Sequence, residues 1–429
     1  MTDDVPTDAA PTATVPTETA TNDAASANAA STDDAPTDAG PATVGLADAR
    51  ARAAGTTGVP SFDELPTLPG SGIQHAWDVW GRGDNLGTLN RLTGPVVAAA
   101  TACVRTGERI GLSLPVGLPD PGFFGRKALS HHFTPMMGGT AWDDWVDGFY
   151  LQCSSQWDGL RHVGTSDGWY GGWRGQPADD LRPLGIQHWA EHGIIGRGVL
   201  VDLASFAARD AGHEAADDAG RTGPAAGQAD TAGQADTAGQ ADTAGQADTA
   251  GQADTAGGRA GSPAGGRDRY DPFGRVTFRP DDIAAALRAQ GVSLRDGDIL
   301  CVRTGWTDRY LELDAAGRSA LADAMQEVTG HPSAGLAGSE DMARFLWNSG
   351  VAAVACDNPS VEVVPGDPAD GSLHRRLIPG LGMAIGELFS FAELAAACAR
   401  TGRYEFLFVA VPLNVTGAVG SPANAVAIL

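Results

Sequence analysis

Residues 338–357 read GSEDMARFLWNSGVAAVACD and place a helix signal directly before a strand signal. The segment GSEDMARFLWNSG (338–350) opens with Ser and two acidic residues and closes at Gly350, which predicts a capped helix. VAAVACD (351–357) is a short apolar run that ends in a polar group, as buried strands do. A helix that leads straight into a buried strand is the repeating unit of mixed α/β proteins.

The same alternation extends in both directions from this segment. Helices are predicted at Val96–Arg105, 280–291 and 389–402, and strands at 108–116, 196–204, 296–306 and 404–413. Strands on both sides of residues 208–268 contribute to this pattern, so the sequence predicts one α/β domain with an insertion.

Two segments differ from this domain in composition. Residues 1–58 carry nine acidic and two basic side chains, and residues 210–258 carry nine acidic and one basic, within a chain of net charge -24. Both have few large apolar residues, so neither can bury enough surface to offset the entropy of ordering. Five copies of GQADTA fill 227–256, and this polar repeat offers no face for stacking. We therefore predict a disordered tail at 1–58 and a domain at 59–429, interrupted by a disordered insertion at about 208–268.

The composition also narrows the class of partner. An acidic balance argues against nucleic acid and anionic membrane surfaces. No apolar run approaches the roughly 20 residues of a membrane helix, and the first residues lack the basic and apolar parts of a secretory signal. The five Cys show no CxxC spacing, which favours reduced thiols. A cytoplasmic protein that acts on a small molecule is expected.

The densest group of polar side chains lies in QCSSQWDGLRH (152–162). On a strand, Gln152, Gln156 and Asp158 would share one face, and His162 could return to it after a turn. A carboxylate, an imidazole and amide oxygens can hold a divalent metal ion and leave room for water. The same spacing fits a buried polar network without a metal, so both interpretations stand at this point.

Aromatic residues flank this stretch on both sides. Trp142, Trp145 and Trp157 could line an apolar pocket for a ring-shaped substrate, although each could equally pack in the core. His131 and His132 precede FTPMMGG and are expected in a loop beside the pocket, where His132 could contact substrate.

A second histidine motif is present at His188-Trp-Ala-Glu191-His192, the H-x-x-E-H pattern of inverted zinc proteases. That pattern needs a continuous helix, but GIIGRG follows at once and predicts a short one. A surface or packing role is expected. The Gly-rich GRGDNLG (81–87) lacks the Lys-Ser/Thr of a P-loop and is predicted to be a turn.

Residues 152–162 resemble the signature of the cyclase family, which includes kynurenine formamidases and isatin hydrolase. The signature has the form H-x-G-T-H-x-D-x-P-x-H and aligns here without a gap. Asp158 and His162 fall on its Asp and its last His. Gln152 and Gln156 fall on its first two His, which is a departure from the family pattern.

The resemblance covers most of the chain outside the two low-complexity segments. LHRRLIPGLGMAIGELF (373–389) is similar to the family segment that supplies a late His and Glu, here His374 and Glu387. Further similar segments are WGRGDNLGTLNRLT (80–93), GRGVLVDL (196–203), GDILCVRTGW (297–306), ACDNPSVE (355–362) and GSPANAVAIL (420–429).

The resemblance implies an α/β fold with a central mixed, barrel-like β-sheet and flanking helices. It also implies a hydrolase that opens or cleaves an amide or lactone carbonyl in a small aromatic or cyclic substrate through a metal-activated water. Family members are usually homo-oligomers, so a homodimer or homotetramer is expected.

Carried over by position, the resemblance implies a role for each polar residue. His162 is the predicted acid/base, since its pKa range suits proton transfer near neutrality. The predicted ligands of a Zn or Mn ion are Gln152, Gln156, Asp158, His374 and Glu387.

Because of Gln152 and Gln156, the resemblance does not determine which substrate the enzyme acts on. Amide oxygens are harder and weaker donors than imidazole, and a similar Gln-x-x-x-Gln-x-Asp pattern resembles the trans-dienelactone hydrolase branch of the family. One alternative is an arylformamidase that hydrolyses N-formylkynurenine in tryptophan catabolism. The other is a catalytically inactive relative that binds a small ligand.

Overall fold

The computed structural model describes residues 58–209, 270–327 and 329–429. The tail predicted at 1–58 and the insertion predicted at about 208–268 therefore lie outside the described residues, except at their boundaries. Residues 203–209, which precede the insertion, are helical. Within the described ranges, no helix combines the length and the apolar character that crossing a bilayer requires.

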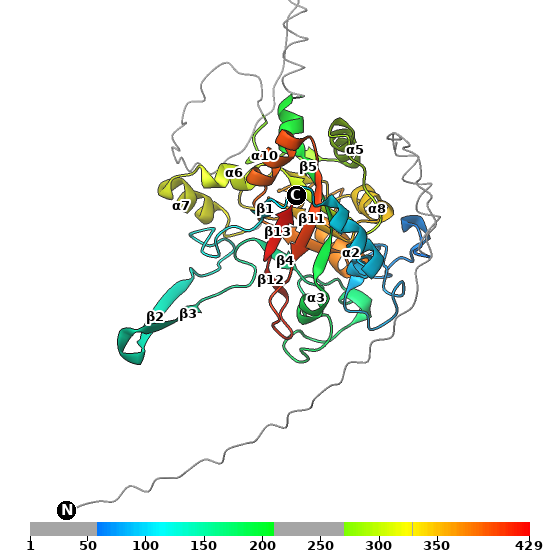
Figure 1. The fold of residues 1–429 in the computed structure, drawn as a ribbon. Coiled ribbons are helices and arrows are strands. Elements are labelled where there is room, and N and C mark those ends of the chain that lie inside the picture. Colours follow the sequence, from blue (N-terminus) through cyan, green and yellow to red (C-terminus); the bar gives the residue numbers. More distant parts are fainter. Residues whose placement is uncertain (1–57, 210–269, 328) are drawn as a thin grey trace, which may run out of the picture. The chain divides into compact units, whose positions relative to one another are not determined.

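A nine-stranded mixed sheet is the centre of the fold (Figure 1). Its four middle strands, β5, β7, β9 and β10, are parallel, and the strands on either side of them are antiparallel. Helical connections join the parallel strands, as parallel pairing requires. In spatial order the strands are β1 (Arg109–Gly111), β13 (Ala425–Ile428), β11 (Glu405–Ala410), β5 (Ile194–Asp202), β7 (Ile299–Arg303), β9 (Ala353–Cys356), β10 (Ala384–Glu387), β4 (Gln156–Asp158) and β12 (Gly420–Pro422).

The connection between β12 and β13 shows that this sheet curls. β12 is the ninth strand in spatial order and β13 the second, and only Ala423 and Asn424 separate them. In a flat sheet these strands would lie roughly 34 Å apart at ~4.8 Å per strand, whereas so short a link spans only about 10 Å. The two ends of the sheet must therefore approach each other. A backbone bond agrees with this, because Ser390 N, just after β10, donates to Leu112 O, just after β1. The predicted mixed, barrel-like sheet is confirmed.

Helices α5 and α8 cover the convex face of the curled sheet. Ile283 and Leu287 of α5 pack with Leu346 and Trp347 of α8 against alternate side chains of the parallel strands, such as Val354. The helices are α2 (Gly94–Ala100), α3 (Gln187–His192), α5 (Pro280–Ala289), α6 (Trp306–Leu311), α7 (Ala315–Ala324), α8 (Glu340–Asn348), α9 (Leu373–Arg375) and α10 (Ala392–Thr401). Short 3-10 helices lie at Phe62–Glu64, Gly87–Arg91, Thr101–Cys103, Met137–Gly139 and Tyr170–Gly172, and a π-helix at Arg376–Leu381.

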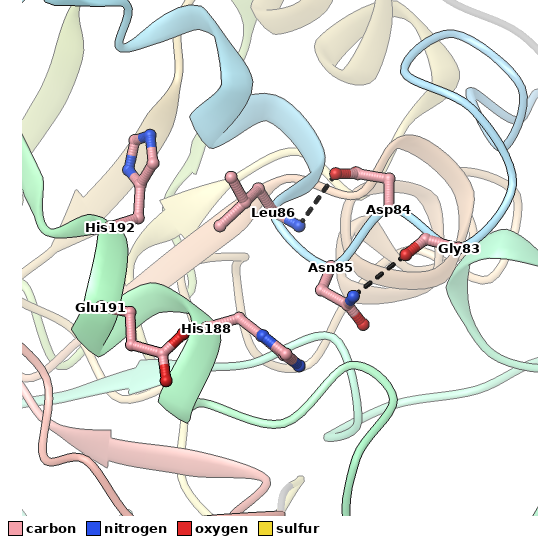
Figure 2. Close-up of a pocket in the computed structure, with 7 residues that line it drawn as sticks. All are labelled: Gly83, Asp84, Asn85, Leu86, His188, Glu191 and His192. Atoms are coloured by element: carbon pink, nitrogen blue, oxygen red, sulfur yellow. Dashed lines mark hydrogen bonds between the residues drawn. The ribbon is translucent and has the colours of Figure 1, made fainter.

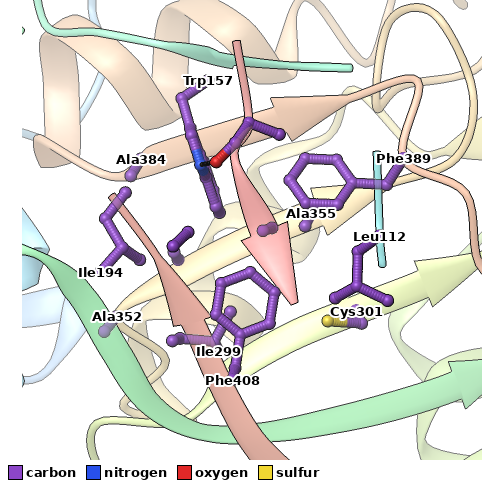
Figure 3. Packing of buried hydrophobic residues seen from close by; sticks show 14 of the residues in the cluster. Leu112, Trp157, Ile194, Ile299, Cys301, Ala352, Ala355, Ala384, Phe389 and Phe408 are labelled. Atoms are coloured by element: carbon purple, nitrogen blue, oxygen red, sulfur yellow. Dashed lines mark hydrogen bonds between the residues drawn. The ribbon is translucent and has the colours of Figure 1, made fainter. Parts of the chain in front are cut away.

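The concave face combines small residues on the parallel strands with large aromatic residues (Figure 3). Gly198 of β5 has no room for a side chain, because a Cβ there would lie 2.3 Å from the Phe406 ring. Trp157 packs edge-on to Phe389 at a ring separation of 5.2 Å. Aromatic rings fill the interior that a curled sheet encloses, so this face is a packed core.

The predicted helices at 280–291, 338–350 and 389–402 are confirmed as α5, α8 and α10. The strand predicted at 108–116 is shorter than expected, since β1 covers Arg109–Gly111 only. A small two-stranded sheet of β6 (Thr277–Phe278) and β8 (Gly335–Leu336) adds to the architecture.

The predicted loop around His131 and His132 is wrong, because this segment is a strand. β2 (Ser130–Met136) pairs with β3 (Ala141–Asp147) in an antiparallel hairpin. Both strands are largely exposed, so burial imposes no alternation of polar and apolar residues on their sequence.

Candidate metal centre

Pairing between β4 and β10 brings the first part of the site together. Glu387 lies directly opposite Gln156 in the antiparallel register, and the Gln156 Nε2 donates to Glu387 Oε2 at 2.7 Å. Asp158 is two residues along β4 and projects on the same side. Trp157, between them, projects into the core on the other face. The strand register therefore gathers an amide and two carboxylates on one side of the sheet.

His374 enters the site from the short helix α9. Its Nε2 lies 3.1 Å from Glu387 Oε1 and 3.8 Å from Asp158 Oδ2. Its Nδ1 lies 3.2 Å from Glu362 Oε1. Ser372 caps α9 and fixes the backbone beside the ring. Asp158, His374 and Glu387 each offer a ligand atom, and these atoms lie within 4.8 Å of one another.

Glu362 was not predicted from the sequence. It follows β9, and its carboxylate accepts hydrogen bonds from the Ser372 hydroxyl and from the backbone N–H of Leu373 as well as from His374. The available signal was its position in the polar cluster after an apolar strand. Its function depends on its contact with His374, and the sequence alone does not show which side chains come into contact on folding.

His162 and Gln152 form the second part of the site. A turn in which His162 N donates to Gly159 O returns the chain after β4. The Gln152 Nε2 donates to His162 Nδ1 at 2.9 Å, and the His162 Nε2 lies 3.8 Å from Asp158 Oδ2. Because Nδ1 accepts this bond, a neutral His162 carries its proton on Nε2, the nitrogen that faces Asp158.

The strand predicted through Gln152 is wrong, since residues 151–155 form turns and bends and β4 begins at Gln156. Ser154 donates to Pro115 O, and the Ser155 hydroxyl accepts from Leu114 N while donating to Leu388 O. These side-chain bonds to neighbouring backbone replace a strand ladder. Gln152 therefore approaches the site through a turn and contacts His162 rather than Glu387.

Burial dominates the electrostatics of the centre. It raises the pKa of Glu387 to about 7, and the nearby Asp158 charge acts in the same direction. Burial alone would lower the pKa of His374, but hydrogen bonds to Glu362 and Glu387 outweigh it and raise that pKa well above the usual value. The site therefore holds protons that a cation would have to displace.

The buried oxygens indicate that a cation fits here. Asp158 is fully buried, and among the described residues neither of its carboxylate oxygens has a hydrogen-bond partner. The Gln156 Oε1 is buried and unpaired in the same way. A buried carboxylate without hydrogen bonds costs free energy, and the imidazoles of His162 and His374 approach it only to 3.8 Å. A divalent ion beside Asp158, His374 and Glu387 would compensate it more closely. The donor set of carboxylates, imidazole and amide oxygen suits a divalent cation.

The aromatic residues predicted for the pocket do not gather at this centre. Trp157 is completely buried in the core. Trp142 and Trp145 lie on β3, 62% and 48% exposed, and His132 stacks on Trp145 at a ring separation of 5.0 Å. All three of these hairpin residues are thus held on an exposed two-stranded sheet. Their predicted contact with substrate stays a prediction.

The H-x-x-E-H motif lies beside a separate open pocket of about 450 Å³. Figure 2 shows His188, Glu191 and His192 projecting from α3 in different directions. The His188 Nε2 contacts Arg182 O and the His192 Nδ1 contacts Gly193 O, each at 2.8 Å. α3 has only six residues, as the following Gly-rich segment predicted. In the described part of the chain, these three side chains do not converge on a common point where an ion could bind.

Comparisons with known proteins agree with this architecture. Residues 268–363 match the model of a protein family described as "Putative cyclase". The crystal structure of a novel cyclase aligns with 83% of this chain and 99% of its own, at 26% identity and a TM-score of 0.59. A comparison with curated proteins gives no match.

Two other solved structures are more distant. Isatin hydrolase A from Labrenzia aggregata aligns with 79% of this chain and 98% of its own, at 14% identity and a TM-score of 0.43. A predicted metal-dependent hydrolase from Bacillus stearothermophilus aligns with 75% and 97%, at 14% identity and a TM-score of 0.34.

Proposed function

We propose that this chain, which belongs to the cyclase family, is a metal-dependent hydrolase of a small amide or lactone. The observation that carries the proposal is the Asp158 carboxylate, which is fully buried and makes no hydrogen bond beside His374 and Glu387. Such a group is costly in a purely structural role and useful as a ligand. An aromatic or cyclic substrate is proposed, as the family resemblance implies.

Asp158, His374 and Glu387 would hold the ion, with the Gln156 Oε1 as a further donor. When bound, Zn²⁺ or Mn²⁺ supplies Lewis acidity and lowers the pKa of a water toward about 7. Glu362 is hydrogen-bonded to the far nitrogen of His374, so it orients the ring and makes its Nε2 face the other ligands.

His162 is placed to handle the proton of the reaction. Hydrolysis breaks the bond from the carbonyl carbon to nitrogen or oxygen, adds the water oxygen to that carbon, and delivers a proton to the leaving atom. The Gln152 amide holds the His162 proton on Nε2, on the side of Asp158. His162 therefore acts as the acid/base, and Gln152 positions it rather than binding the ion.

The test is elemental analysis of protein purified without chelator, with wild type beside Asp158→Ala, followed by a screen of lactones, cyclic amides and N-formylkynurenine. Near-stoichiometric Zn or Mn in the wild type, lost in the variant together with turnover, is expected. A wild type that stays metal-free after incubation with both ions would contradict the proposal. Equal turnover by the wild type and by Asp158→Ala would contradict it as well. A metal-free wild type would favour the alternative of a relative that binds a small ligand without turnover.

The substrate screen separates the two hydrolase alternatives. Lactone turnover that exceeds formamide turnover supports the interpretation based on the Gln pair. A clear preference for N-formylkynurenine would instead identify an arylformamidase. We retain the expectation of a cytoplasmic enzyme for either case.

A further inference from the structure

Arg126 lies on the chain between β1 and β2, and its guanidinium has no acidic partner. In the described part of the chain its side chain makes no ion pair and no hydrogen bond, although it is half-buried. Its contact is with an aromatic ring, because the guanidinium carbon lies 5.1 Å from the centre of the Phe124 ring. A cation over the face of a ring keeps its N–H donors free. Arg126 can therefore still bind an anion.

The segment that leads to this arginine begins beside the turn that precedes β4. The Ser154 hydroxyl donates to Pro115 O at 3.1 Å, and the Cys153 thiol donates to Val116 O at 3.8 Å. Gln152 belongs to the same turn. Residues 115 and 116 are therefore held against one side of the metal centre.

The end of the same segment packs next to Glu387. Phe123 is buried in a cluster with Leu388, the residue directly after Glu387, and Phe124 packs against that cluster. The Arg126 N–H donates to Phe123 O at 3.1 Å and closes a turn around Phe124. Phe124 has a φ of 57°, a left-handed conformation that persists only where the surrounding structure holds it, often at ligand sites. The turn thus presents Arg126 from a fixed position.

The charge of Arg126 acts on residues at two edges of the centre. Burial raises the pKa of the Cys153 thiol, and the Arg126 charge opposes that rise. Burial and the Asp158 charge raise the pKa of Glu387, and the Arg126 charge again acts in the opposite direction. The guanidinium is therefore within electrostatic reach of the turn at Cys153 and of the predicted ligand Glu387.

The centre is open on the side of Gln152 and His162. Both residues are half-buried, and the His162 side chain is 28% exposed. Asp158 is fully buried, so a substrate reaches the ion site from the side of His162. The Arg126 charge acts on Cys153, the neighbour of Gln152, which places the guanidinium toward this open side.

We propose that Arg126 binds a carboxylate of the substrate, at a position separate from the carbonyl that is hydrolysed. This role depends on the proposed function and narrows the substrate class to amides or lactones that also carry an acid group. A guanidinium presents two parallel N–H groups that match the two oxygens of a carboxylate. A single negative charge suits this site better than a more highly charged anion, because the chain has a net charge of -24 and the centre contains two carboxylates.

The test compares the hydrolysis of phthalide-3-carboxylate and of its carboxamide, two lactones that differ by one negative charge. The wild type should prefer the acid in kcat/KM, and Arg126→Gln should lower that preference about 10–100-fold, the contribution of a charge-assisted pair. Arg126→Lys keeps the charge without the planar fork and should recover part of the preference. Lys127→Gln, which removes the exposed neighbouring cation, is the control and should keep the wild-type preference. All four proteins should contain the same amount of metal.

Calorimetric titration of the metal-loaded protein with benzoate and with benzamide tests the same contact without turnover. Benzoate should bind the wild type more tightly than benzamide does, and Arg126→Gln should remove that difference. This result in a protein that hydrolyses neither lactone would support the carboxylate site and count against the proposed hydrolase.

Two outcomes of the titration would overturn the role of Arg126. One is an equal affinity of the wild type for benzoate and benzamide. The other is a preference for benzoate that persists in Arg126→Gln with a circular dichroism spectrum equal to wild type, because the ion rather than Arg126 would then recognise the acid.

Discussion

At the scale of single residues, the surroundings of Asp158 distinguish a metal centre from a structural network of hydrogen bonds. A carboxylate in a structural network is stabilised by donors, and its loss leaves those donors unpaired. In the described chain Asp158 makes no hydrogen bond, and its nearest imidazole nitrogens, on His162 and His374, lie 3.8 Å away. One of its oxygens instead lies within 4.8 Å of a ligand atom of His374 and of Glu387, which is the arrangement that an ion requires.

Asp158→Asn should therefore remove metal binding without weakening the metal-free protein. In chelator, we expect the free energy of unfolding in urea to be unchanged or higher, because a buried charge is removed. A residue of a structural network would instead lose about 1–3 kcal/mol. Such a loss in Asp158→Asn would contradict the metal assignment.

His162→Ala should separate acid/base chemistry from metal binding. We expect kcat to fall by about 10²–10⁴-fold, the usual contribution of a positioned acid or base, while metal content by elemental analysis stays at the wild-type level. Gln152→Ala, which removes the bond to Nδ1, should lower kcat by a smaller factor. Loss of the ion in His162→Ala would show that the imidazole is a ligand.

Glu362→Gln should weaken the site through His374. A carboxylate on the far nitrogen of a ligating imidazole orients the ring, and its loss commonly costs about 10–100-fold in metal affinity. Competition with a chromogenic chelator measures this change. Glu340→Gln on the surface of α8 is the control, and an equal affinity for both variants would rule out a positioning role for Glu362.

The candidate site was partly predictable from sequence at this scale. Asp158, His374 and Glu387 were identified because motif positions fix them. Glu362 was missed because its function arises from a contact with a ring twelve residues away. Trp157 was placed among pocket candidates, but strand alternation turns it away from Asp158 and into the core.

At the scale of elements, burial determined which parts could be predicted. α5, α8 and β9 are buried on one or more sides, so their apolar patterns are strict and the predictions hold. β2 and β3 are exposed on both faces, and their sequence shows no such pattern.

Gly198→Ala should destabilise the curled sheet. The new Cβ would lie 2.3 Å from the Phe406 ring, and overpacking of this kind costs about 1–3 kcal/mol of unfolding free energy. Gly111→Ala on β1, where no atom lies within 4 Å of the added Cβ, is the matched control. Urea unfolding of both variants measures the difference, and equal stabilities would mean that the concave core is not tightly packed.

At the scale of the whole molecule, the two acidic segments have the sequence properties of chain that takes no part in the domain. The described residues on either side of the predicted insertion are ordered parts of the domain. Tyr270 donates its hydroxyl proton to Thr304 O at 2.6 Å, and residues 203–209 are helical. The ends of the predicted insertion are thus fixed by the domain itself.

Deletion of residues 210–258 should leave kcat and the melting temperature close to wild type. Loop-closure entropy changes slowly with length, by only about 0.6 kcal/mol for each doubling. Steady-state kinetics and thermal unfolding of the shortened protein measure both quantities. A large fall in turnover in a shortened protein that is still folded would show that the segment contributes to activity.

The two-residue link between β12 and β13 has a consequence for the newly made chain. Among the described residues β1 pairs only with β13, so Arg109 has no strand partner until Ile428 has been synthesised. β4 and β11 also lack one neighbour until residues 420–428 have left the ribosome. Until then, unpaired strand edges are open to other chains, and pairings this distant in sequence form slowly. The parallel strands in the centre of the sheet can pair during synthesis, but its outer strands complete their pairing only at the end. Added chaperone should therefore raise the soluble yield.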